Sequence, residues 1–270
     1  MTTRPVSIPP RTVLTVLPAI MIATVAMCGP FLAPHGIRDS VDIPFAGPSG
    51  DAWLGTDHLG QDVTSNLLAG GWGLITIAAV IAVGVTACAA LLGAAAALRP
   101  GIGAVVERIA DSVMLVPPIL AMLLVMLSWP SSGTFGLVLV ATLIGTPYSA
   151  RVFAAAASSI AASGYVEVAV ASGESLPYLL VREVLPNLRP TIAAQLGLRF
   201  VEAIYLVSTA AFLQLPASLG QTNWAIMVRE NSSGIMLNPW AVIAPAVAIA
   251  AVSIGVAFTV RRFDTAGRIR

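Results

Sequence analysis

Residues 74–98, which read LITIAAVIAVGVTACAALLGAAAAL, form a continuous apolar run without a single charged side chain. A helix that crosses the hydrocarbon layer of a bilayer, about 30 Å thick, needs about 20 mostly apolar residues. The strands of a membrane barrel would instead alternate apolar and polar residues over short segments, and this run does not alternate. The run therefore predicts a transmembrane helix and places the chain among all-α membrane proteins.

Similar runs recur along the 270 residues, of which 57% are hydrophobic, and the mean hydropathy is +0.89. An ordinary soluble domain has only about 45–50% apolar residues. Apolar stretches of suitable length and without clustered charge predict six transmembrane helices, at about residues 12–33, 73–98, 109–129, 135–158, 190–213 and 239–260. A cleaved amino-terminal signal is a less favoured interpretation of the first stretch.

The cationic residues predict how these helices are oriented, and all 14 of them are arginines. Positively charged residues gather on the cytoplasmic side of membrane proteins. With a cytoplasmic amino terminus, only Arg38 and Arg229 fall outside, and only Arg199 falls within a span. The arginines that fall on or near the cytoplasmic side are Arg4, Arg11, Arg99, Arg108, Arg151, Arg182, Arg189, Arg261, Arg262, Arg268 and Arg270. Both termini are therefore predicted to be cytoplasmic, and no basic groove is left to bind nucleic acid.

Two features of the predicted bundle concern its packing. Pro117 and Pro118 lie within the third span, where proline removes backbone hydrogen bonds and should kink the helix. Gly84, Gly93 and the alanines at 94–97 give the second span a small-residue surface that favours close helix packing. Residues 99–101, Arg-Pro-Gly, should form a tight turn after that span.

The segment 163–187, SGYVEVAVASGESLPYLLVREVLPN, is a charged stretch that falls on the cytoplasmic side between the fourth and fifth spans. Its pattern predicts a short helix that starts at Ser163 or Gly164 and is interrupted by Gly173. A second short helix should follow and end at residues 185–187, Leu-Pro-Asn. Such a pair of helices is suited to docking, and its acidic residues argue against an amphipathic helix lying on anionic lipid.

Two motifs resemble a known family. The pattern E-x-A-x-x-x-G followed by L-P-N resembles the cytoplasmic loop of bacterial ABC-transporter permeases. The pattern L-G-T-D-x-x-G-x-D-V-x-S at residues 54–65 is similar to the outer loop of the dipeptide, oligopeptide and nickel permeases. The likeness extends over about residues 50–262. It also includes Asp111 with Pro117, the pair Asn223-Trp224 and the pair Pro239-Trp240. The chain looks closest to the second permease of such systems.

The sequence also departs from the family's usual pattern at four positions. Val168 stands where alanine is customary in the cytoplasmic motif, and Gln61 replaces an arginine of the outer motif. Ala225 and Val207 replace a usual glycine and glutamate. These departures leave the predicted fold intact but weaken any inference about the substrate.

The resemblance implies a type I ABC importer permease with six transmembrane helices and a cytoplasmic coupling helix. Residues 1–70 would hold the amino-terminal cytoplasmic tail, the first transmembrane helix and an extracytoplasmic loop. Residues 71–262 would form the permease core with the coupling loop 163–187, and residues 263–270 a cytoplasmic tail. The localisation implied is the cell membrane, crossed several times.

The resemblance further implies an ATP-driven importer of short peptides in which this chain forms half of the translocation pathway. The partners would be a second homologous permease, two ATP-binding cassette subunits, an extracytoplasmic binding protein, the peptide and the lipid bilayer. The chain itself would be no enzyme and would bind no cofactor, because ATP and Mg²⁺ would be held by the partner subunits. It has no G-x-x-x-x-G-K-[ST] motif for phosphates and no lysine.

Three groups of residues are candidate sites. The residues expected to couple to the ATPase are Tyr165, Glu167, Ala169, Ser172, Gly173, Leu185, Pro186 and Asn187. The extracytoplasmic motif consists of Leu54, Gly55, Thr56, Asp57, Gly60 and Asp62. Asp57, His58 and Asp62 carry ligand atoms suited to a metal, but turn and helix-capping chemistry is the preferred interpretation and no metal site is assigned.

The third candidate is the pair Arg199 and Glu202, which share a helix face within the fifth span. Ionisable residues at this depth are expensive and commonly functional. Two interpretations remain open at this point: a structural ion pair, or a pair that lines the pathway and meets the charged termini of a peptide.

Competing functions remain as well. Uptake of nickel or a metal chelate would use the same fold. An ion-coupled secondary transporter is less favoured, because only Asp111 and Glu202 supply carboxylates within or near the spans. An integral-membrane enzyme is disfavoured, since no cluster of catalytic residues is evident.

Overall fold

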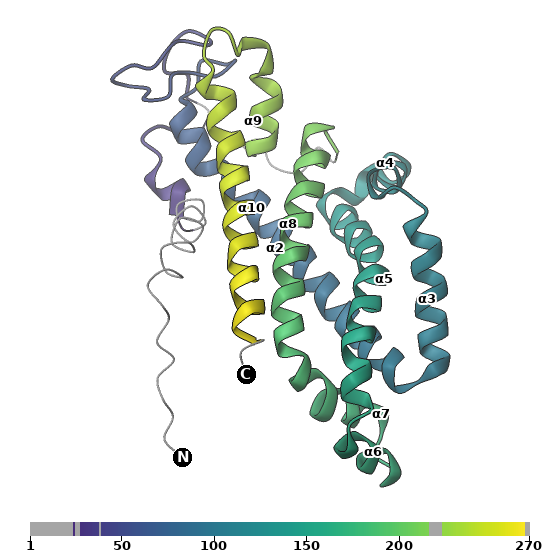
Figure 1. The fold of residues 1–270 in the computed structure, drawn as a ribbon. Helices are drawn as coiled ribbons and strands as arrows, with labels where there is room; N and C mark the ends of the chain where they lie inside the picture. The colour runs from purple at the N-terminus through teal and green to yellow at the C-terminus, as the bar shows by residue number, and fades with distance from the viewer. Residues whose placement is uncertain (1–23, 25–27, 38, 216–222, 268–270) are drawn as a thin grey trace, which may run out of the picture. The chain divides into compact units, whose positions relative to one another are not determined.

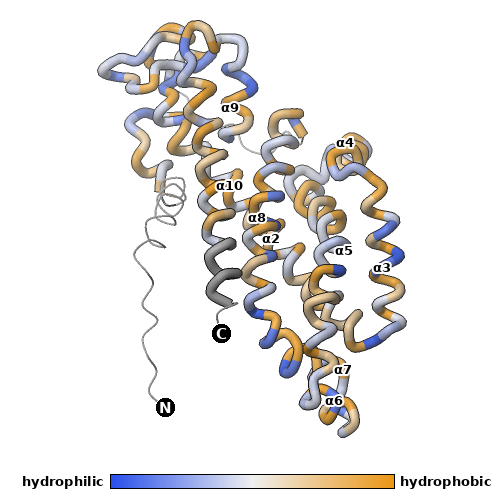
Figure 2. The backbone as a smooth tube through the Cα atoms, in the orientation of Figure 1, coloured by the Kyte–Doolittle hydropathy of each residue, from blue (hydrophilic) through white to orange (hydrophobic). Residues whose placement is uncertain are grey.

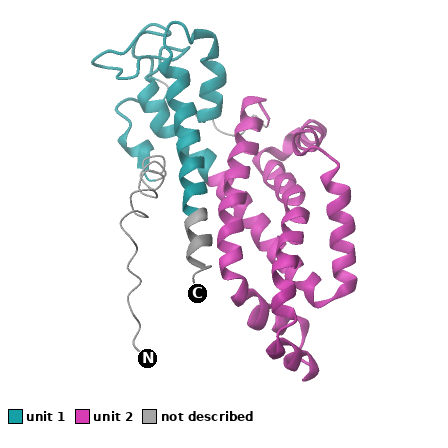
Figure 3. Cartoon of the chain, in the orientation of Figure 1, with its two compact units in different colours: residues 1–75, 220–266 teal, residues 76–219, 267–270 magenta. Residues whose placement is uncertain are grey.

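The computed structural model describes residues 24, 28–37, 39–215 and 223–267. The chain divides into two compact units, one made of residues 1–75 and 220–266 and the other of residues 76–219 and 267–270 (Figure 3). Apart from the irregular loop before α2, the described parts are mainly helical, and their only extended pairings are the isolated bridges Ser40–Gln61 and Thr56–Asp62. The all-α prediction is confirmed.

Within the described residues, four helical stretches are long and apolar enough to cross a membrane: Val63–Leu98, Pro130–Ala161, Leu176–Phe212 and Trp240–Thr259. They contain the helices α2 (Val63–Leu98), α5 (Gly133–Ala161), α8 (Arg189–Phe212) and α10 (Trp240–Gly267) (Figure 1). Apolar residues dominate along these helices (Figure 2). These stretches confirm the predicted second, fourth, fifth and sixth spans. Most of the first predicted span, 12–33, lies outside the described residues.

The third span differs from the prediction, because it breaks instead of kinking. Helix α3 (Pro100–Met114) and helix α4 (Pro118–Ser128) are bent by 83° relative to each other. Pro117 has φ −58° and ψ 126°, an extended conformation that ends one helix before Pro118 opens the next. Two adjacent prolines thus remove consecutive amide donors and force extended backbone between them, which a single kink cannot accommodate.

The turn between α2 and α3 is as tight as predicted. Helix α2 ends at Leu98 and α3 begins at Pro100, so Arg99 alone separates them. Arg99 is extended, with φ −134° and ψ 106°, and Pro100 occupies the first turn of α3, where no amide donor is needed.

The core of the second unit is organised around α5, against which α3, α4 and α8 pack. Its largest member is the fully buried Phe153, which lies among alanines of α2. A Cβ atom built at Gly93 would lie 2.5 Å from both the Ala150 carbonyl oxygen and Phe153 Cβ. The predicted small-residue packing surface is therefore confirmed, and its partner is α5.

The first unit joins the start of α2 to the short helices α9 (Trp224–Glu230) and η4 (Ser232–Gly234), to α10 and to the loop before α2. Trp224 Nε1 donates a hydrogen bond of 2.7 Å to the Leu67 carbonyl. The same indole lies 3.0 Å from a Cβ atom built at Gly70, so this glycine lets α9 approach α2.

We predict that Gly93→Ala destabilises the protein in detergent by about 1–3 kcal/mol, because the added methyl overlaps backbone and side-chain atoms of α5 that cannot move cheaply. Thermal unfolding of the purified protein measures this. Gly101→Ala is the matched control, since no atom of the described residues lies within 4 Å of its Cβ position. Equal melting temperatures for the two variants would contradict the assigned contact.

Candidate functional site

The segment 163–187 forms a separate short helix followed by a helical passage into α8. Helix α6 spans Gly164–Ala171, preceded by Ser163 in an extended conformation. Gly173 then adopts φ +81°, which a residue with a side chain rarely adopts. The predicted start of the first helix and its interruption by Gly173 are both confirmed.

The end of the second helix differs from the prediction. Helix α7 (Leu176–Tyr178) continues through a π-helical turn, η2 (Leu179–Val184), and a 3-10 turn, η3 (Leu185–Leu188), directly into α8. Pro186 and Pro190 lie in the first turns of η3 and α8, where their missing amide donors are not needed. The prolines therefore change the helix type without ending the helical path, which runs from Leu176 to Phe212.

The segment 163–187 is anchored by a few buried residues and is otherwise largely exposed. Val166 of α6 is fully buried, and Val184 and Leu188 belong to the same buried cluster as Phe153. Val168 of α6 is 66% exposed. Tyr165, Glu167 and Val170 of the same helix are also exposed, as are Ser172 and Glu174 beyond its end. Apolar side chains exposed outside the predicted spans mark a candidate surface for a protein–protein contact.

The structure brings the two halves of the cytoplasmic motif together at one contact. Asn187 Nδ2 donates to the Tyr165 hydroxyl oxygen at 3.2 Å and to the Glu183 carbonyl at 2.6 Å. This side chain therefore ties α6 to the turn that leads into α8. Ala169, Leu185 and Pro186 are half-buried.

The outer motif forms a compact turn structure in the first unit. Asp57 Oδ1 accepts backbone hydrogen bonds from Leu59 at 2.8 Å and Gln61 at 2.9 Å, and Asp57 Oδ2 accepts from Asn66 Nδ2 at 3.2 Å. The Thr56 hydroxyl donates to the Ile43 carbonyl at 2.7 Å. Asp57 and Thr56 are buried, so their polar atoms hold the loop together from within.

Asp62 caps helix α2, as the sequence predicted. Its two oxygens accept from the backbone amides of Thr64 and Ser65, each at 3.0 Å, and Oδ2 also accepts from the Ser65 hydroxyl at 2.6 Å. His35 Nδ1 lies 3.5 Å from Asp62 Oδ2. The carboxylate thus supplies acceptors to amide groups that a helix start leaves without partners.

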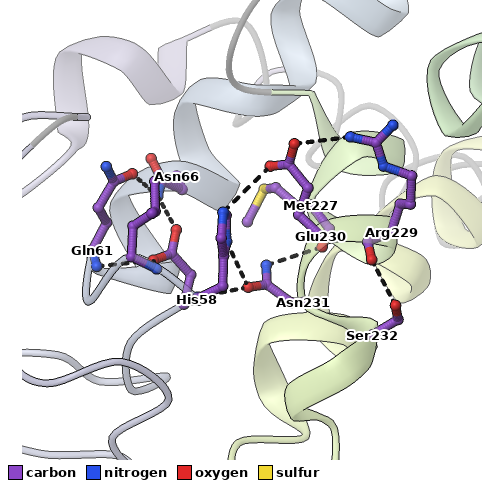
Figure 4. A network of polar contacts seen from close by, with 10 residues as sticks. His58, Gln61, Asn66, Met227, Arg229, Glu230, Asn231 and Ser232 are labelled. Carbon is purple, nitrogen blue, oxygen red and sulfur yellow. Dashed lines mark hydrogen bonds and ion pairs between the residues drawn. The ribbon is translucent and has the colours of Figure 1, made fainter. Parts of the chain in front are cut away.

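Two buried asparagines that the sequence did not single out complete this fold (Figure 4 shows the first). Asn231 Oδ1 accepts from the His58 amide at 2.9 Å, while its Nδ2 donates to the Met227 carbonyl. Asn238 Nδ2 donates to the carbonyls of residues 54 and 56, each at 2.9 Å. Asn238 lies between the apolar residues 235–237 and 239–240, and an amide in such a run was the available signal, whereas Asn231 has polar neighbours and gave none.

The two glycines of the outer motif allow this packing. Gly55 has φ +73°, and a Cβ there would lie 2.3 Å from the Ala46 carbonyl oxygen. Gly60 has φ +76°, and a Cβ atom built there would lie 2.2 Å from the Asp42 carbonyl oxygen. Leu54 contributes its carbonyl to Asn238, so every residue of the motif has a place in the turn structure.

The three residues considered as metal ligands point to separate partners. Asp57 and Asp62 bind backbone amides, whereas the His58 ring lies 3.3 Å from Asn231 Oδ1 and 3.9 Å from Glu230 Oε2. Among the described residues, no three His, Cys, Asp or Glu side chains converge on a metal position. The turn and capping interpretation agrees with these contacts.

Arg199 and Glu202 form an ion pair on α8, with Arg199 Nη1 donating to Glu202 Oε2. The guanidinium also lies over the Tyr148 ring of α5, 5.5 Å from its centroid. The pair is asymmetric, because the Arg199 side chain is 13% exposed and that of Glu202 39%. A second ion pair, Arg151 Nη2 to Asp111 Oδ1 at 2.6 Å, links α5 to α3 at the surface.

These features define a multi-pass helical membrane protein with one anchored, exposed loop between spans. Residues 89–268 match the model of the binding-protein-dependent transport system inner membrane components. The chain belongs to this family of membrane transport components, as its two sequence motifs predicted.

Relatives with related names match most of the chain. The probable D,D-dipeptide transport system permease protein DdpC of Escherichia coli K12 is 26% identical over 91% of this chain and 83% of its own length. The dipeptide transport system permease protein DppC of Bacillus subtilis is 27% identical over 82% of this chain and 69% of its own length. The peptide transport system permease protein SapC of Escherichia coli O6:H1 is 30% identical over 84% of this chain and 79% of its own length.

We predict that Asp62→Ala lowers the stability of the first unit by about 0.5–2 kcal/mol, since the first turn of α2 loses its acceptors. Hydrogen exchange of the amides at 64 and 65 should become faster. The matched control is Asp51→Ala, because Asp51 is exposed and makes no side-chain hydrogen bond with the residues that the structure describes. Unchanged exchange at these amides in Asp62→Ala would refute the capping role.

Proposed function

We propose that this chain is one of the two permease subunits of an ATP-driven importer of short peptides. Its membership of the transport family supports the transporter class, and the names of its relatives support peptides as the solute. The observation that carries the proposal is α6, an exposed helix tied by Asn187 to the start of a membrane span. Such a helix is suited to receive motion from a partner.

The partners proposed are those of the family: a second homologous permease, two ATPase subunits and an extracytoplasmic binding protein. ATP and Mg²⁺ would be held by the ATPase subunits. The absence from this sequence of lysine and of a phosphate-binding G-x-x-x-x-G-K-[ST] motif supports that division of labour. This chain would therefore supply half of the pathway and no catalytic residue.

Coupling would pass through α6 into α8. When the ATPase subunits close, a short helix seated in a cleft of an ATPase subunit would move with that subunit. Val166 and the Asn187–Tyr165 contact hold α6 against the remainder of the loop. Because the helical path from Leu176 to Phe212 has no break, displacement of α6 would tilt the span that carries Arg199 and Glu202. The exposed Glu167 is available for a charge-assisted contact with the ATPase.

The orientation proposed places this loop and both termini in the cytoplasm. Leu98 and Ile102, at the turn between α2 and α3, pack on the same cluster as Val184 and Leu188. The turn and the loop therefore lie at the same end of the second unit (Figure 1). Arg99, Arg182 and Arg189 belong to these segments, and such an excess of arginine marks a cytoplasmic end. The outer motif would then face the binding protein on the other side.

The proposed function predicts ATP-dependent uptake of short peptides by the complete complex. Proteoliposomes that contain both permeases and the ATPase subunits, supplied with the binding protein loaded with a labelled dipeptide or tripeptide, should accumulate label only when ATP is available to the ATPase subunits. Omission of this chain is the control. Accumulation of nickel but no peptide would refute the peptide assignment while leaving the transporter class intact.

We predict that Gly173→Leu uncouples transport, because φ +81° is strained for any residue with a side chain and α6 would shift relative to α8. Uptake should fall at least about tenfold, which corresponds to about 1.4 kcal/mol. The variant should still insert into the membrane.

Gly164→Ala provides the matched control for that loop. Its Cβ position has no atom of the described residues within 4 Å, and its φ is not positive. Uptake should therefore remain near the unsubstituted level. If Gly173→Leu also transports normally and stimulates ATP hydrolysis as before, the coupling role of this loop is wrong.

A further inference from the structure

Helix α8 carries a polar stripe on one face within the membrane span. Gln195, Arg199 and Glu202 follow one another at spacings of four and three residues, which places their side chains on the same side of the helix. The ring of Tyr148 on α5 lies against the guanidinium of Arg199. These four residues all belong to the second unit.

The stripe contains buried polar atoms whose bonding capacity is not used. Among the described residues, Arg199 Nε and Gln195 Oε1 have no hydrogen-bond partner, although both atoms are buried. Gln195 as a whole is only 8% exposed. A polar atom without a partner is expensive in an apolar environment, where water does not supply the missing bond. The described residues therefore leave hydrogen-bonding capacity on this stripe unused.

Arg199 is the residue with the largest unused capacity. A guanidinium has five N–H donors in a planar fork, and here a single carboxylate oxygen, Glu202 Oε2, accepts from one of its terminal nitrogens. The guanidinium carbon lies over the Tyr148 ring, 5.5 Å from its centroid, and this contact uses none of the N–H donors in a hydrogen bond. A planar fork with free edges is matched best by a second carboxylate, which it binds through two parallel hydrogen bonds.

We propose that Arg199 binds the terminal carboxylate of the transported peptide and that Glu202 is the counter-ion which this carboxylate displaces. This inference rests on the proposed function, because it names how the same solute is recognised in the pathway. Tyr148 is a positioning residue, because its ring lies beside the guanidinium carbon, and Gln195 Oε1 is an acceptor one turn away for an N–H group of the peptide.

Displacement of Glu202 explains why binding of the peptide carboxylate would be reversible. In the ligand-free chain the ion pair lowers the cost of holding an arginine within the span. The half-exposed Glu202 can turn toward a wetted pathway when a peptide carboxylate replaces it, while the less exposed Arg199 stays in place. Because the peptide carboxylate takes the place of the Glu202 carboxylate, the net charge next to Arg199 stays the same. Glu202 can therefore return to Arg199 when the peptide is released.

The test compares two labelled peptides that differ only at the carboxyl terminus, one with a free carboxylate and one with an amide. The assembled complex is reconstituted in proteoliposomes, each peptide is loaded on the binding protein, and uptake is measured per loaded binding protein. The unsubstituted complex should import the free-carboxylate peptide about tenfold faster, the loss expected when a charged hydrogen-bonding group is removed.

The Arg199→Gln variant should import both peptides at the same low rate, and Arg199→Lys should restore part of the preference. Glu202→Gln should lower the KM for the free-carboxylate peptide and also lower the maximal rate, because the competing anion is gone. Arg189→Gln, an exposed arginine at the start of the same helix, is the matched control and should keep the full preference.

The outcomes separate this inference from the proposed function. If the unsubstituted complex imports neither peptide, the peptide function and this inference both fail. If it imports peptides but Arg199→Gln keeps the preference for the free carboxylate, Arg199 is only part of a structural ion pair and the inference alone fails. Should Arg199→Gln not assemble, an unchanged KM in the Glu202→Gln complex would equally overturn the carboxylate-binding role.

Discussion

The shortage of hydrogen-bond partners in an apolar environment is the constraint on which this structure depends. In a chain this apolar, each buried polar atom is either paired or remains costly. The first unit meets the constraint with a few polar side chains of which each makes several bonds. Asp57 holds a turn, Asp62 caps α2, and Asn231 and Asn238 bind backbone groups about 170 residues or more away in sequence. Loss of one such group would leave several others without partners.

In the second unit the same constraint is met by helices and close packing. It also limits the positions at which proline can occur without loss of a hydrogen bond. The passage from α7 to α8 contains Pro177, Pro186 and Pro190, yet it remains helical throughout. Each proline lies in the first turn of an element, where its missing donor costs nothing. Pro117 and Pro118 instead interrupt one apolar run, so the chain there breaks into two helices.

Periodicity and composition predicted most of this fold, because apolar length alone identifies a membrane span. The turn at Arg99 and the interruption at Gly173 were predicted from local stereochemistry, which needs no tertiary information. The packing role of Gly93 was predicted from the small side chains around it, but its partner α5 was not. The partners of Asn231 and Asn238 could not be predicted, since they depend on contacts between distant segments. The break at residues 115–117 was underestimated, because a pattern of apolar residues does not distinguish a bent helix from two helices.

The contrast between the two halves of the segment 163–187 explains how a small loop can serve transport. A helix that only lay on the surface would move without affecting the span, and a helix fully continuous with the span would present little free surface to a partner. Here Gly173 separates α6 from the helical path, and Asn187 binds it back through Tyr165. The separation exposes the surface of α6, whereas the side-chain contact and the buried Val166 limit its independent motion. In the proposed coupling, force applied to α6 would reach α8 through the hydrogen bond between Asn187 and Tyr165 and through the packing of Val166, and a single substitution can remove either of them.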